Sequence, residues 1–297
     1  MKVLVTGSSS HLARAVLPLL CAQERIIRVT GVDIAAAHFT HPKFIAVSGD
    51  IREQSLAAVL DGHDVLVHLA FVVLRGRMNA AQMADINVSG SYRFFQAARE
   101  AGVRRLIHLS SAAVYGEGDG VDELTPFAPL RGFLYGEHKA QLERLLAAEF
   151  PECVRLRPHV ILGPNAQALL RTLLKLPLYP ALPGPYPRLQ CVHEDDVARA
   201  VLLAIERDVC GPFNLASEDS FSYRDIIRQQ HRLALPLPQG LARTGLYAAW
   251  RLGGWGGEPA WIEGLARTLT LDCRHAKQEL GWHSHYDSAA IVAATVR

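Results

Sequence analysis

Short apolar runs alternate with longer amphipathic segments over residues 1–157 of the chain. The short runs are rich in β-branched residues, whereas the longer segments repeat apolar positions at the spacing of a helix. The runs predict strands at residues 2–6, 27–33, 44–48, 64–69, 105–110 and 153–157, and the segments predict helices near residues 11–22, 54–60, 80–101 and 136–148. Because strands joined by helices form parallel sheets, this order predicts an α/β fold with a doubly wound parallel sheet.

The pattern changes after residue 158. Residues 176–187 contain five prolines, which exclude a regular helix or a central strand there. Pro18 falls inside the first expected helix and should kink or shorten it, because proline has no backbone N–H. We therefore expect the sheet to come mainly from the first part of the chain, and a smaller, less regular region from the rest.

The composition excludes several classes of protein. The 31 Lys and Arg residues nearly balance the 29 Asp and Glu residues, and 49% of the 297 residues are hydrophobic. Such a chain is not disordered and presents no strong basic field for nucleic acid. The five cysteines are scattered without a CxxC pair, which disfavours a zinc site and favours a reducing compartment. With no leader and no long apolar run, we expect a cytoplasmic protein without a membrane span.

A Ser-rich turn joins the first expected strand to the first expected helix, and it reads Thr6-Gly7-Ser8-Ser9-Ser10-His11-Leu12-Ala13. In a dinucleotide-binding turn, three spaced glycines provide the tight bend, the close approach to the pyrophosphate and the contact between helix and strand. Gly7 holds the first of these positions, whereas Ser10 and Ala13 hold the other two. The turn is therefore either a phosphate cradle of altered sequence or an ordinary helix N-cap.

Asp33 ends the second expected strand. A carboxylate at this distance from the turn accepts hydrogen bonds from the adenosine ribose hydroxyls. It would also repel a 2′-phosphate, so Asp33 favours NAD over NADP. A solvated turn residue is the alternative interpretation of Asp33.

Tyr135 and Lys139 lie four residues apart at the start of an expected helix, so that their side chains share a face. An ammonium beside a phenol favours the phenolate, and we expect the pKa of Tyr135 to fall from about 10 toward neutrality. Alone, this spacing is more typical of a surface pair. The preceding strand, however, ends at Ser110 and Ser111, which places hydroxyls at the sheet edge where such folds bind ligands. His138 is expected to face another side of the helix and the solvent.

Taken in order, the motifs of this chain resemble the extended short-chain dehydrogenase/reductase family, often labelled NAD-dependent epimerase/dehydratase. Each match is weak alone, but the ordered series spans nearly the whole chain. The resemblance implies a Rossmann sheet that binds NAD. The matching segments are Thr6-Gly7, Asp33, Asp50-Ile51, His68-Leu69-Ala70, Asn87-Val88-Ser89-Gly90-Ser91, Ser111, Val114-Tyr115-Gly116, Tyr135 with Lys139, Arg157-Pro158, Gly163-Pro164, Val192-His193-Glu194-Asp195-Asp196-Val197, Phe213-Asn214-Leu215-Ala216 and Glu279-Leu280-Gly281-Trp282.

The resemblance also implies roles for the matched residues. Tyr135 would exchange a proton with a substrate hydroxyl or carbonyl, and Ser111 would hydrogen-bond the same oxygen. Lys139 would hold the nicotinamide ribose and tune Tyr135, while hydride moves between a substrate carbon and the nicotinamide. The implied cofactor-binding residues are Gly7, Ser9, Ser10, His11, Leu12, Asp33, Asp50, Ile51, Leu69, Ala70, Asn87, Tyr135, Lys139 and Pro158.

The residues after Ser111 discriminate among the reactions of the resembled family. Dehydratases resemble Thr-Asp-Glu and decarboxylases resemble Ser-Glu there, because those reactions need further acid–base groups. Here Ala112 and Ala113 follow Ser111, so dehydration and decarboxylation are disfavoured. We therefore expect an NAD-dependent epimerase or dehydrogenase acting at a secondary alcohol or ketone of a sugar-like substrate.

The diphosphate-binding arginine of nucleotide-sugar epimerases is not evident in this sequence. Leu189 occupies its position, and Arg188 is one residue away, where strand alternation turns it to the opposite face. A smaller polyol, sugar lactone, hydroxy acid or sterol-like alcohol is therefore nearly as plausible as a nucleotide sugar.

The family pattern divides the chain into an NAD-binding domain over residues 1–160, with a returning segment at about 188–216. Residues 161–187 and 217–297 would form a small, discontinuous substrate-binding region. Family habit implies a homodimer through helices 80–101 and 136–148, with exposed apolar outer faces. The alternative class is a non-catalytic NAD(P)-binding redox sensor, which the altered turn favours and the presence of both Tyr135 and Lys139 disfavours.

Overall fold

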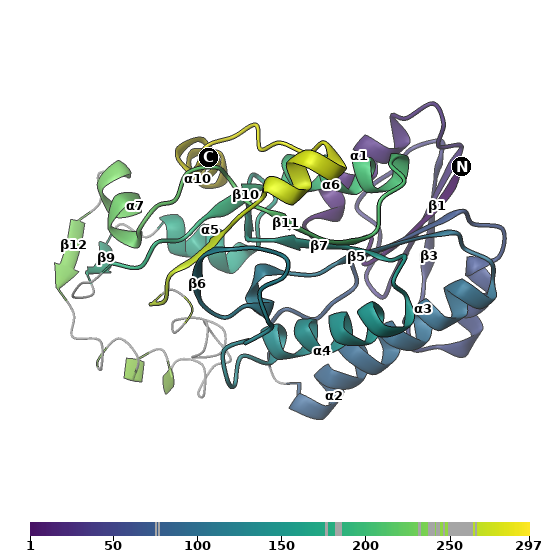
Figure 1. Ribbon diagram of the computed structural model, residues 1–297, viewed down its shortest axis with the longest axis horizontal. Helices are drawn as coiled ribbons and strands as arrows, with labels where there is room; N and C mark the ends of the chain where they lie inside the picture. Colours follow the sequence, from purple (N-terminus) through teal and green to yellow (C-terminus); the bar gives the residue numbers. More distant parts are fainter. Residues whose placement is uncertain are drawn as a thin grey trace.

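The computed structural model describes residues 1–74, 76, 78–175, 178–181, 186–230, 233–236 and 266–297, together with residues 241, 244, 245, 247, 248 and 264. Its centre is a sheet of seven parallel strands in the order β11-β7-β5-β4-β1-β2-β3 (Figure 1). The strands are β1 (Lys2–Thr6), β2 (Arg28–Asp33), β3 (Phe44–Ser48), β4 (Val65–His68), β5 (Arg105–Leu109), β7 (Val154–Pro158) and β11 (Gly211–Leu215). The predicted doubly wound parallel sheet is confirmed, and β11 joins it from later in the chain.

The strand order reverses between β1 and β4. In sheets of this kind the connections after these two strands leave in opposite directions, and ligands bind outside their carboxyl ends. The Gly7 turn follows β1 and residues 69–74 follow β4, so both border this switch point. The register sets Thr6, the last residue of β1, beside His68 at the end of β4.

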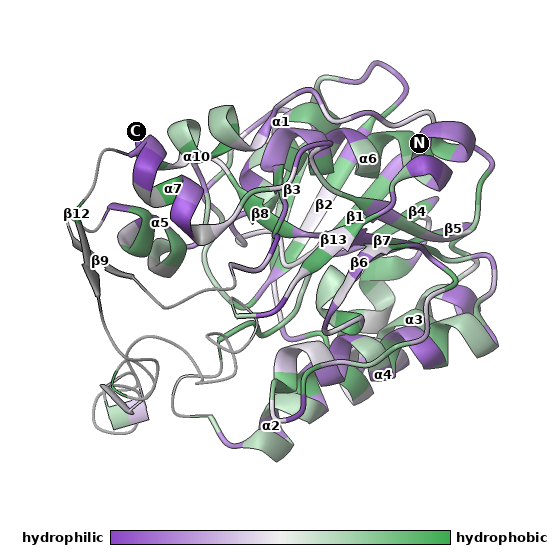
Figure 2. Cartoon of the chain, turned by 60° about the vertical axis from the view of Figure 1, so that its left-hand side comes forward, coloured by the Kyte–Doolittle hydropathy of each residue, from purple (hydrophilic) through white to green (hydrophobic). Residues whose placement is uncertain are grey.

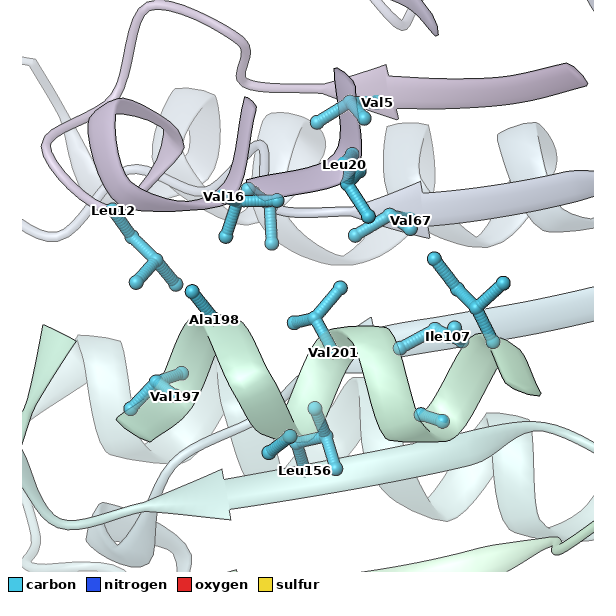
Figure 3. Packing of buried hydrophobic residues seen from close by; sticks show 14 of the residues in the cluster. Val5, Leu12, Val16, Leu20, Val67, Ile107, Leu156, Val197, Ala198 and Val201 are labelled. Atoms are coloured by element: carbon cyan, nitrogen blue, oxygen red, sulfur yellow. The ribbon is translucent and has the colours of Figure 1, made fainter. Parts of the chain in front are cut away.

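One layer of helices covers the first face of the sheet and consists of α1 (Ala13–Cys21) and α6 (Glu194–Glu206). Figure 3 shows Val16 of α1 and Val201 of α6 in one cluster with Val67 of β4. These side chains are fully or almost fully buried, so the layer is held mainly by apolar burial. The N-terminus of α1, which borders the switch point, is fixed by this cluster.

The second layer covers the opposite face. It consists of α2 (Ala80–Ala84), η2 (Asp85–Gly90), α3 (Ser91–Glu100) and α4 (Leu134–Glu149). The expected helix 80–101 is present, but its middle part, η2, has the wider π-helical turn. Such turns are rare and often lie at functional sites. Hydrophobic residues predominate along the central strands between the two layers (Figure 2).

The remaining elements include three two-stranded parallel sheets and several short helices. The strand pairs are β8 (Val160–Leu162) with β10 (Cys191–His193), β9 (Leu178–Ala181) with β12 (Leu233–Pro236), and β6 (Gly118–Val121) with β13 (Leu269–Leu271). The helices are η1 (Gln54–Leu60), which lies within the first part of the chain, and η3 (Ala112–Val114), α5 (Ala168–Lys175), α7 (Tyr223–Gln229), η4 (Ala276–Leu280) and α10 (Ser288–Val296).

The expectations about proline have different outcomes. Helix α1 runs from Ala13 to Cys21 and continues through Pro18, so the expected shortening at Pro18 is not observed. Strand β9 contains Pro180, which a two-stranded sheet tolerates because each strand keeps a free edge. Parts of the expected substrate-binding region, residues 182–185 and 249–263, lie outside the described residues. None of the described helices combines the length and the apolar character that crossing a bilayer requires.

Candidate active site

The three candidate catalytic residues meet at the carboxyl edge of β5 and the first turns of α4. Ser111 follows β5 in an extended conformation, and its hydroxyl accepts a hydrogen bond from the Ala113 N–H at 3.1 Å. The same side chain is hydrogen-bonded to Tyr135. Lys139, one turn further along α4, has its Nζ 5.8 Å from the centroid of the Tyr135 ring. The predicted shared face of Tyr135 and Lys139 is therefore confirmed.

Lys139 is buried, with only 2% of its surface exposed. Its Nζ donates a hydrogen bond to the carbonyl oxygen of Leu109 and lies 3.6 Å from the centroid of the Phe71 ring. An ammonium over an aromatic face is attracted by the ring quadrupole. Burial nevertheless lowers the pKa of Lys139 to about 7, and the nearby Glu143 carboxylate partly opposes this fall. Lys139 therefore changes its charge in the neutral range.

The expected fall in the pKa of Tyr135 is wrong for this chain. Burial raises the pKa of Tyr135 above its ordinary value, and the hydrogen bond with Ser111 only partly opposes the rise. The ring lies between Phe71 and Phe133, each with its centroid 5.7 Å away, and these rings cover part of it. Desolvation disfavours the phenolate because the phenolate is the charged form. Tyr135 is consequently a protonated phenol at neutral pH.

The Gly7 turn is shaped by its contact with the neighbouring strand. Gly7 has φ +70°, and a Cβ added there would lie 2.6 Å from the backbone N of Ala70. Only glycine tolerates both the conformation and the approach. The Ser10 hydroxyl accepts a hydrogen bond from the Ala13 N–H at 3.3 Å, so it serves the start of α1. The Leu12 side chain points into the core cluster (Figure 3), which leaves its backbone for ligand contact.

Asp33 holds this turn in place. One of its carboxylate oxygens accepts the Ser9 N–H at 2.9 Å, and the other accepts the Ala35 N–H at 2.9 Å. The Ser9 hydroxyl donates to the carbonyl oxygens of Ala35 and Ala36. A carboxylate has lone pairs for further donors. Asp33 is therefore placed at the end of β2, beside the turn, where ribose hydroxyls would meet it.

The other candidate cofactor residues line the same edge. Leu69 donates its N–H to the Thr6 carbonyl, and Ala70 donates its N–H to the Thr6 hydroxyl. Pro158 ends β7 and is buried. His11, by contrast, precedes α1 and is exposed; the partial loss of solvent around its ring and the positive charges of Arg14 and Arg171 lower its pKa.

Asp50 and Ile51 follow β3. The Asp50 carboxylate forms an ion pair with Arg52 at 2.7 Å, which lowers its pKa. Arg52 also contacts Asp85 at 3.1 Å. Ile51 is buried, so its side chain belongs to the core. Asp50 therefore already has a charged partner on the side of the sheet where the adenine amino group is expected.

Asn87 lies in the π-helical turn η2 and is fully buried. Its Oδ1 accepts the Val72 N–H at 2.7 Å, and its Nδ2 donates to the Val72 carbonyl at 2.9 Å. This pair of bonds holds the segment after β4 and so places Phe71 against Lys139.

The expectation that His138 faces solvent is wrong. His138 is buried, with its Nδ1 3.5 Å from the Asn87 Nδ2, because α4 packs against η2 on that side.

Sequence reasoning missed two side chains at this site and the partner of a third. Phe71 directly follows the matched Leu69-Ala70 segment, and only the fold shows that its ring covers Lys139. Glu143 lies four residues after Lys139, and that spacing was a usable signal. Ser110 was expected to present its hydroxyl at the ligand-binding edge, whereas this hydroxyl donates to the Glu143 carboxylate.

A row of buried polar residues crosses the sheet beneath Lys139. The register aligns Thr6, His68, His108 and Arg155 on four neighbouring strands. His68 is hydrogen-bonded through one ring nitrogen to Thr6 at 2.8 Å and through the other to Ser91 at 2.9 Å, and burial lowers its pKa to about 3. Within the described part of the chain, neither ring nitrogen of His108 has a hydrogen-bond partner.

We expect the substitution His108→Leu to raise the free energy of unfolding by about 1–3 kcal/mol, because it removes buried polar atoms without partners. Urea unfolding at neutral pH measures this change. His68→Leu is the matched control and should lower stability, because it leaves the hydroxyls of Thr6 and Ser91 without their shared partner. Equal destabilisation by both substitutions would contradict the assignment of His108 as unsatisfied.

The parallel sheet, the Gly7 turn at its switch point and the Ser111, Tyr135 and Lys139 group define an α/β protein of the extended short-chain dehydrogenase/reductase class. A family model described as the NAD dependent epimerase/dehydratase family matches residues 3–216. The chain belongs to this family.

Individual relatives cover most of the chain. An uncharacterized protein of Mycobacterium tuberculosis is 29% identical over 80% of this chain and 67% of its own length. The sterol demethylase protein B of Methylococcus capsulatus is 29% identical over 82% of this chain and 80% of its own length.

Solved structures share the fold. MoeE5 in complex with UDP-glucuronic acid and NAD has a TM-score of 0.81 at 22% identity, covering 100% of this chain and 98% of that chain. The UDP-glucose 4-epimerase of Thermotoga maritima has a TM-score of 0.76 at 21% identity, covering 100% of this chain and 97% of that chain. The predicted Rossmann-type fold is therefore confirmed.

Proposed function

We propose that this protein is an NAD-dependent epimerase or dehydrogenase that transfers hydride at a secondary alcohol or ketone of a sugar-like substrate. The observation that carries this proposal is the meeting of Ser111, Tyr135 and Lys139 at the sheet edge that also carries the Gly7 turn. Proton exchange with a substrate oxygen needs a phenol and a hydroxyl directed at one point. The family to which the chain belongs is NAD-dependent.

The residues at the switch point fit NAD. The backbone of Gly7 lies close to Ala70 without a side chain between them, and Asp33 stands at the end of β2 beside the turn. The turn residues Ser9 to Leu12 would face the pyrophosphate and Asp33 the adenosine ribose, with Lys139 at the nicotinamide ribose. When bound, NAD supplies the nicotinamide that accepts and returns hydride.

The state of each side chain suggests its part in the reaction. Tyr135, whose pKa is raised by burial, holds its proton at neutral pH and can donate it to a carbonyl oxygen during reduction. For oxidation it must accept the substrate proton, and a protonated Lys139 favours the phenolate that does so. Ser111, bonded to Tyr135, would hold the same substrate oxygen. One phenol thereby serves both directions of hydride transfer.

The residues around the site favour some reactions over others. Ala112 and Ala113 provide no titratable group beside Ser111, which disfavours dehydration. Leu189 is buried and bridges to Phe221, while the Arg188 guanidinium is paired with Asp119. No diphosphate clamp is therefore formed by residues 188 and 189, which supports a compact substrate.

Calorimetric titration with NAD, followed by an alcohol and ketone panel read by NADH absorbance, tests the proposed function. The panel contains nucleotide sugars, free sugars and polyols, and sterol alcohols, the last because a relative is a sterol demethylase protein. Turnover on one class supports the enzyme and assigns the substrate. Saturable NAD binding without turnover on any class supports the alternative, a non-catalytic NAD(P)-binding redox sensor.

We expect Asp33→Asn to weaken NAD binding by about tenfold and to reduce the preference for NAD over NADP, because charge-assisted hydrogen bonds are worth about 1.5–3 kcal/mol. The loss of the carboxylate also loosens its bonds to the Ser9 and Ala35 N–H groups. Calorimetry with both dinucleotides measures the effect. Asp61→Asn, at the end of η1, is the matched control and should leave both affinities as they are.

We also propose the domain division given above, with residues 1–160 and 188–216 holding the cofactor and residues 161–187 and 217–297 capping the substrate.

A homodimer through α3 and α4 rests on family habit. None of the exposed large apolar side chains among the described residues lies on α3 or α4, so the expected apolar outer faces are not observed. Light scattering after size exclusion tests the dimer, and a monomer at micromolar concentration would exclude it.

A further inference from the structure

Glu143 is a fully buried carboxylate one turn behind Lys139 on α4. One of its oxygens accepts hydrogen bonds from the Arg157 Nε at 2.7 Å and from the Arg157 Nη2. The other accepts the hydroxyl of Ser110. The Nε of Arg155 lies 3.7 Å from the first oxygen. A carboxylate is retained without solvent only when its lone pairs are satisfied in this way.

Lys139 and Glu143 form hydrogen bonds with consecutive residues at the carboxyl end of β5. Lys139 donates to the carbonyl of Leu109, and Glu143 accepts from the hydroxyl of Ser110. Ser111, whose hydroxyl is bonded to Tyr135, is the next residue. Two side chains one turn apart on α4 therefore fix the backbone that leads into Ser111.

Among the described groups that influence the pKa of Lys139, Glu143 is the only anion. From β4 and β5 it is faced by His68 and His108, and burial lowers the pKa of both, so that both are neutral near pH 7. On β7, Arg155 and Arg157 are positively charged, and both lie near the Glu143 carboxylate. Tyr135, on α4 itself, is a neutral phenol at this pH.

We propose that Glu143 is a positioning residue of the candidate active site, whose charge favours the ammonium form of Lys139 and whose bond to Ser110 fixes the approach to Ser111. The proposal deepens the proposed function and rests on it where it concerns turnover. Its electrostatic part concerns the charge of Lys139 alone and is measured without any substrate.

The chain has five lysines, Lys2, Lys43, Lys139, Lys175 and Lys277, so that lysine labelled with ¹³C at Cε gives few NMR signals. The Lys139 signal is the one absent from Lys139→Met. In Glu143→Gln we expect the titration midpoint of this signal to fall by at least about one pH unit, the usual effect of removing a close opposite charge. In Ser110→Ala, which keeps the carboxylate, the midpoint should stay at the wild-type pH.

Glu143→Gln leaves the buried guanidinium of Arg157 without its partner and therefore threatens folding. The double substitution Glu143→Gln with Arg157→Gln removes both ends of the pair and is compared with Arg157→Gln alone, because loss of the guanidinium by itself raises the Lys139 midpoint. A midpoint lower in Glu143→Gln than in the wild type, or lower in the double variant than in Arg157→Gln, supports the proposal. Equal midpoints within each folded pair overturn it.

Activity on the substrate found by the panel separates the two parts of the proposal. Ser110→Ala should lower kcat while the pH profile keeps its position, because only the approach to Ser111 changes. Glu143→Gln should move the basic limb of the profile to lower pH by the amount seen in the NMR titration. A merely structural role for Glu143 would change stability and leave the profile in place, which would contradict the proposal. If wild-type protein shows no turnover, the proposed function fails, while the NMR result still decides the electrostatic part.

Discussion

Tyr135→Phe is expected to lower kcat by about 10²- to 10⁴-fold, the usual effect of losing a positioned general acid or base. The phenol hydroxyl is the group that meets Ser111, and the aromatic ring, which packs against Phe71 and Phe133, is kept in the variant. NAD affinity should therefore stay close to that of the wild type. Steady-state kinetics on the substrate from the panel, together with NAD calorimetry, measure both quantities.

Tyr92→Phe is the matched control for this substitution. The Tyr92 hydroxyl donates to the Glu149 carboxylate on the outer side of α3 and α4, away from the site. Its removal should leave kcat unchanged. Full turnover by Tyr135→Phe would exclude Tyr135 as the proton donor, whatever the substrate.

Lys139→Met is expected to reduce turnover strongly and, at the same time, to stabilise the fold below neutral pH. The pKa of Lys139 is about 7 in the folded chain and 10.5 in its ordinary setting. Below about pH 7 both states carry the proton, and the folded state bears the whole penalty of a buried ammonium. The unfolding free energy of the variant should exceed that of the wild type there by up to about 5 kcal/mol.

The sign of the pH dependence follows from the same two values. Between about pH 7 and about pH 10.5, the unfolded chain binds a proton that the folded chain has released. Wild-type stability therefore rises with pH in this window relative to Lys139→Met, and the advantage of the variant shrinks. Urea unfolding at about pH 6 and about pH 9 measures the difference. Lys277→Met removes a surface ion pair with Glu218 and is the control. Its difference in unfolding free energy from the wild type should be the same at both pH values.

The strand pattern of the first part of the chain was readable from the sequence because parallel strands are buried on both faces and form continuous apolar runs. Each of the six predicted strands appears within one residue of its expected ends. The π-helical turn η2 was not foreseen, since a single widened turn leaves the helical spacing of apolar residues nearly intact. That turn carries Asn87, which holds the segment behind Phe71.

The sequence predicted only part of the chemistry of the candidate site. The spacing of Tyr135 and Lys139 placed them on one face, because a helix repeats every 3.6 residues. The predicted direction of the shift in the pKa of Tyr135 was wrong, because that pKa depends on how far the phenol is buried and on the rings around it. His138 was placed in solvent by the same reasoning, although η2 packs over it. Neighbours distant in the sequence decided both outcomes.

By itself, the sequence determined the parallel α/β sheet, the Gly7 turn, Asp33 at the end of β2, and the order of Ser111, Tyr135 and Lys139, because each depends on local spacing or on the alternation of strands and helices. Only the tertiary structure decided that Phe71 covers Lys139, that Glu143 binds Ser110 and Arg157, and that burial raises the pKa of Tyr135. Those features join residues from different strands and helices, and the free energy of a buried charge depends on every group that replaces its water.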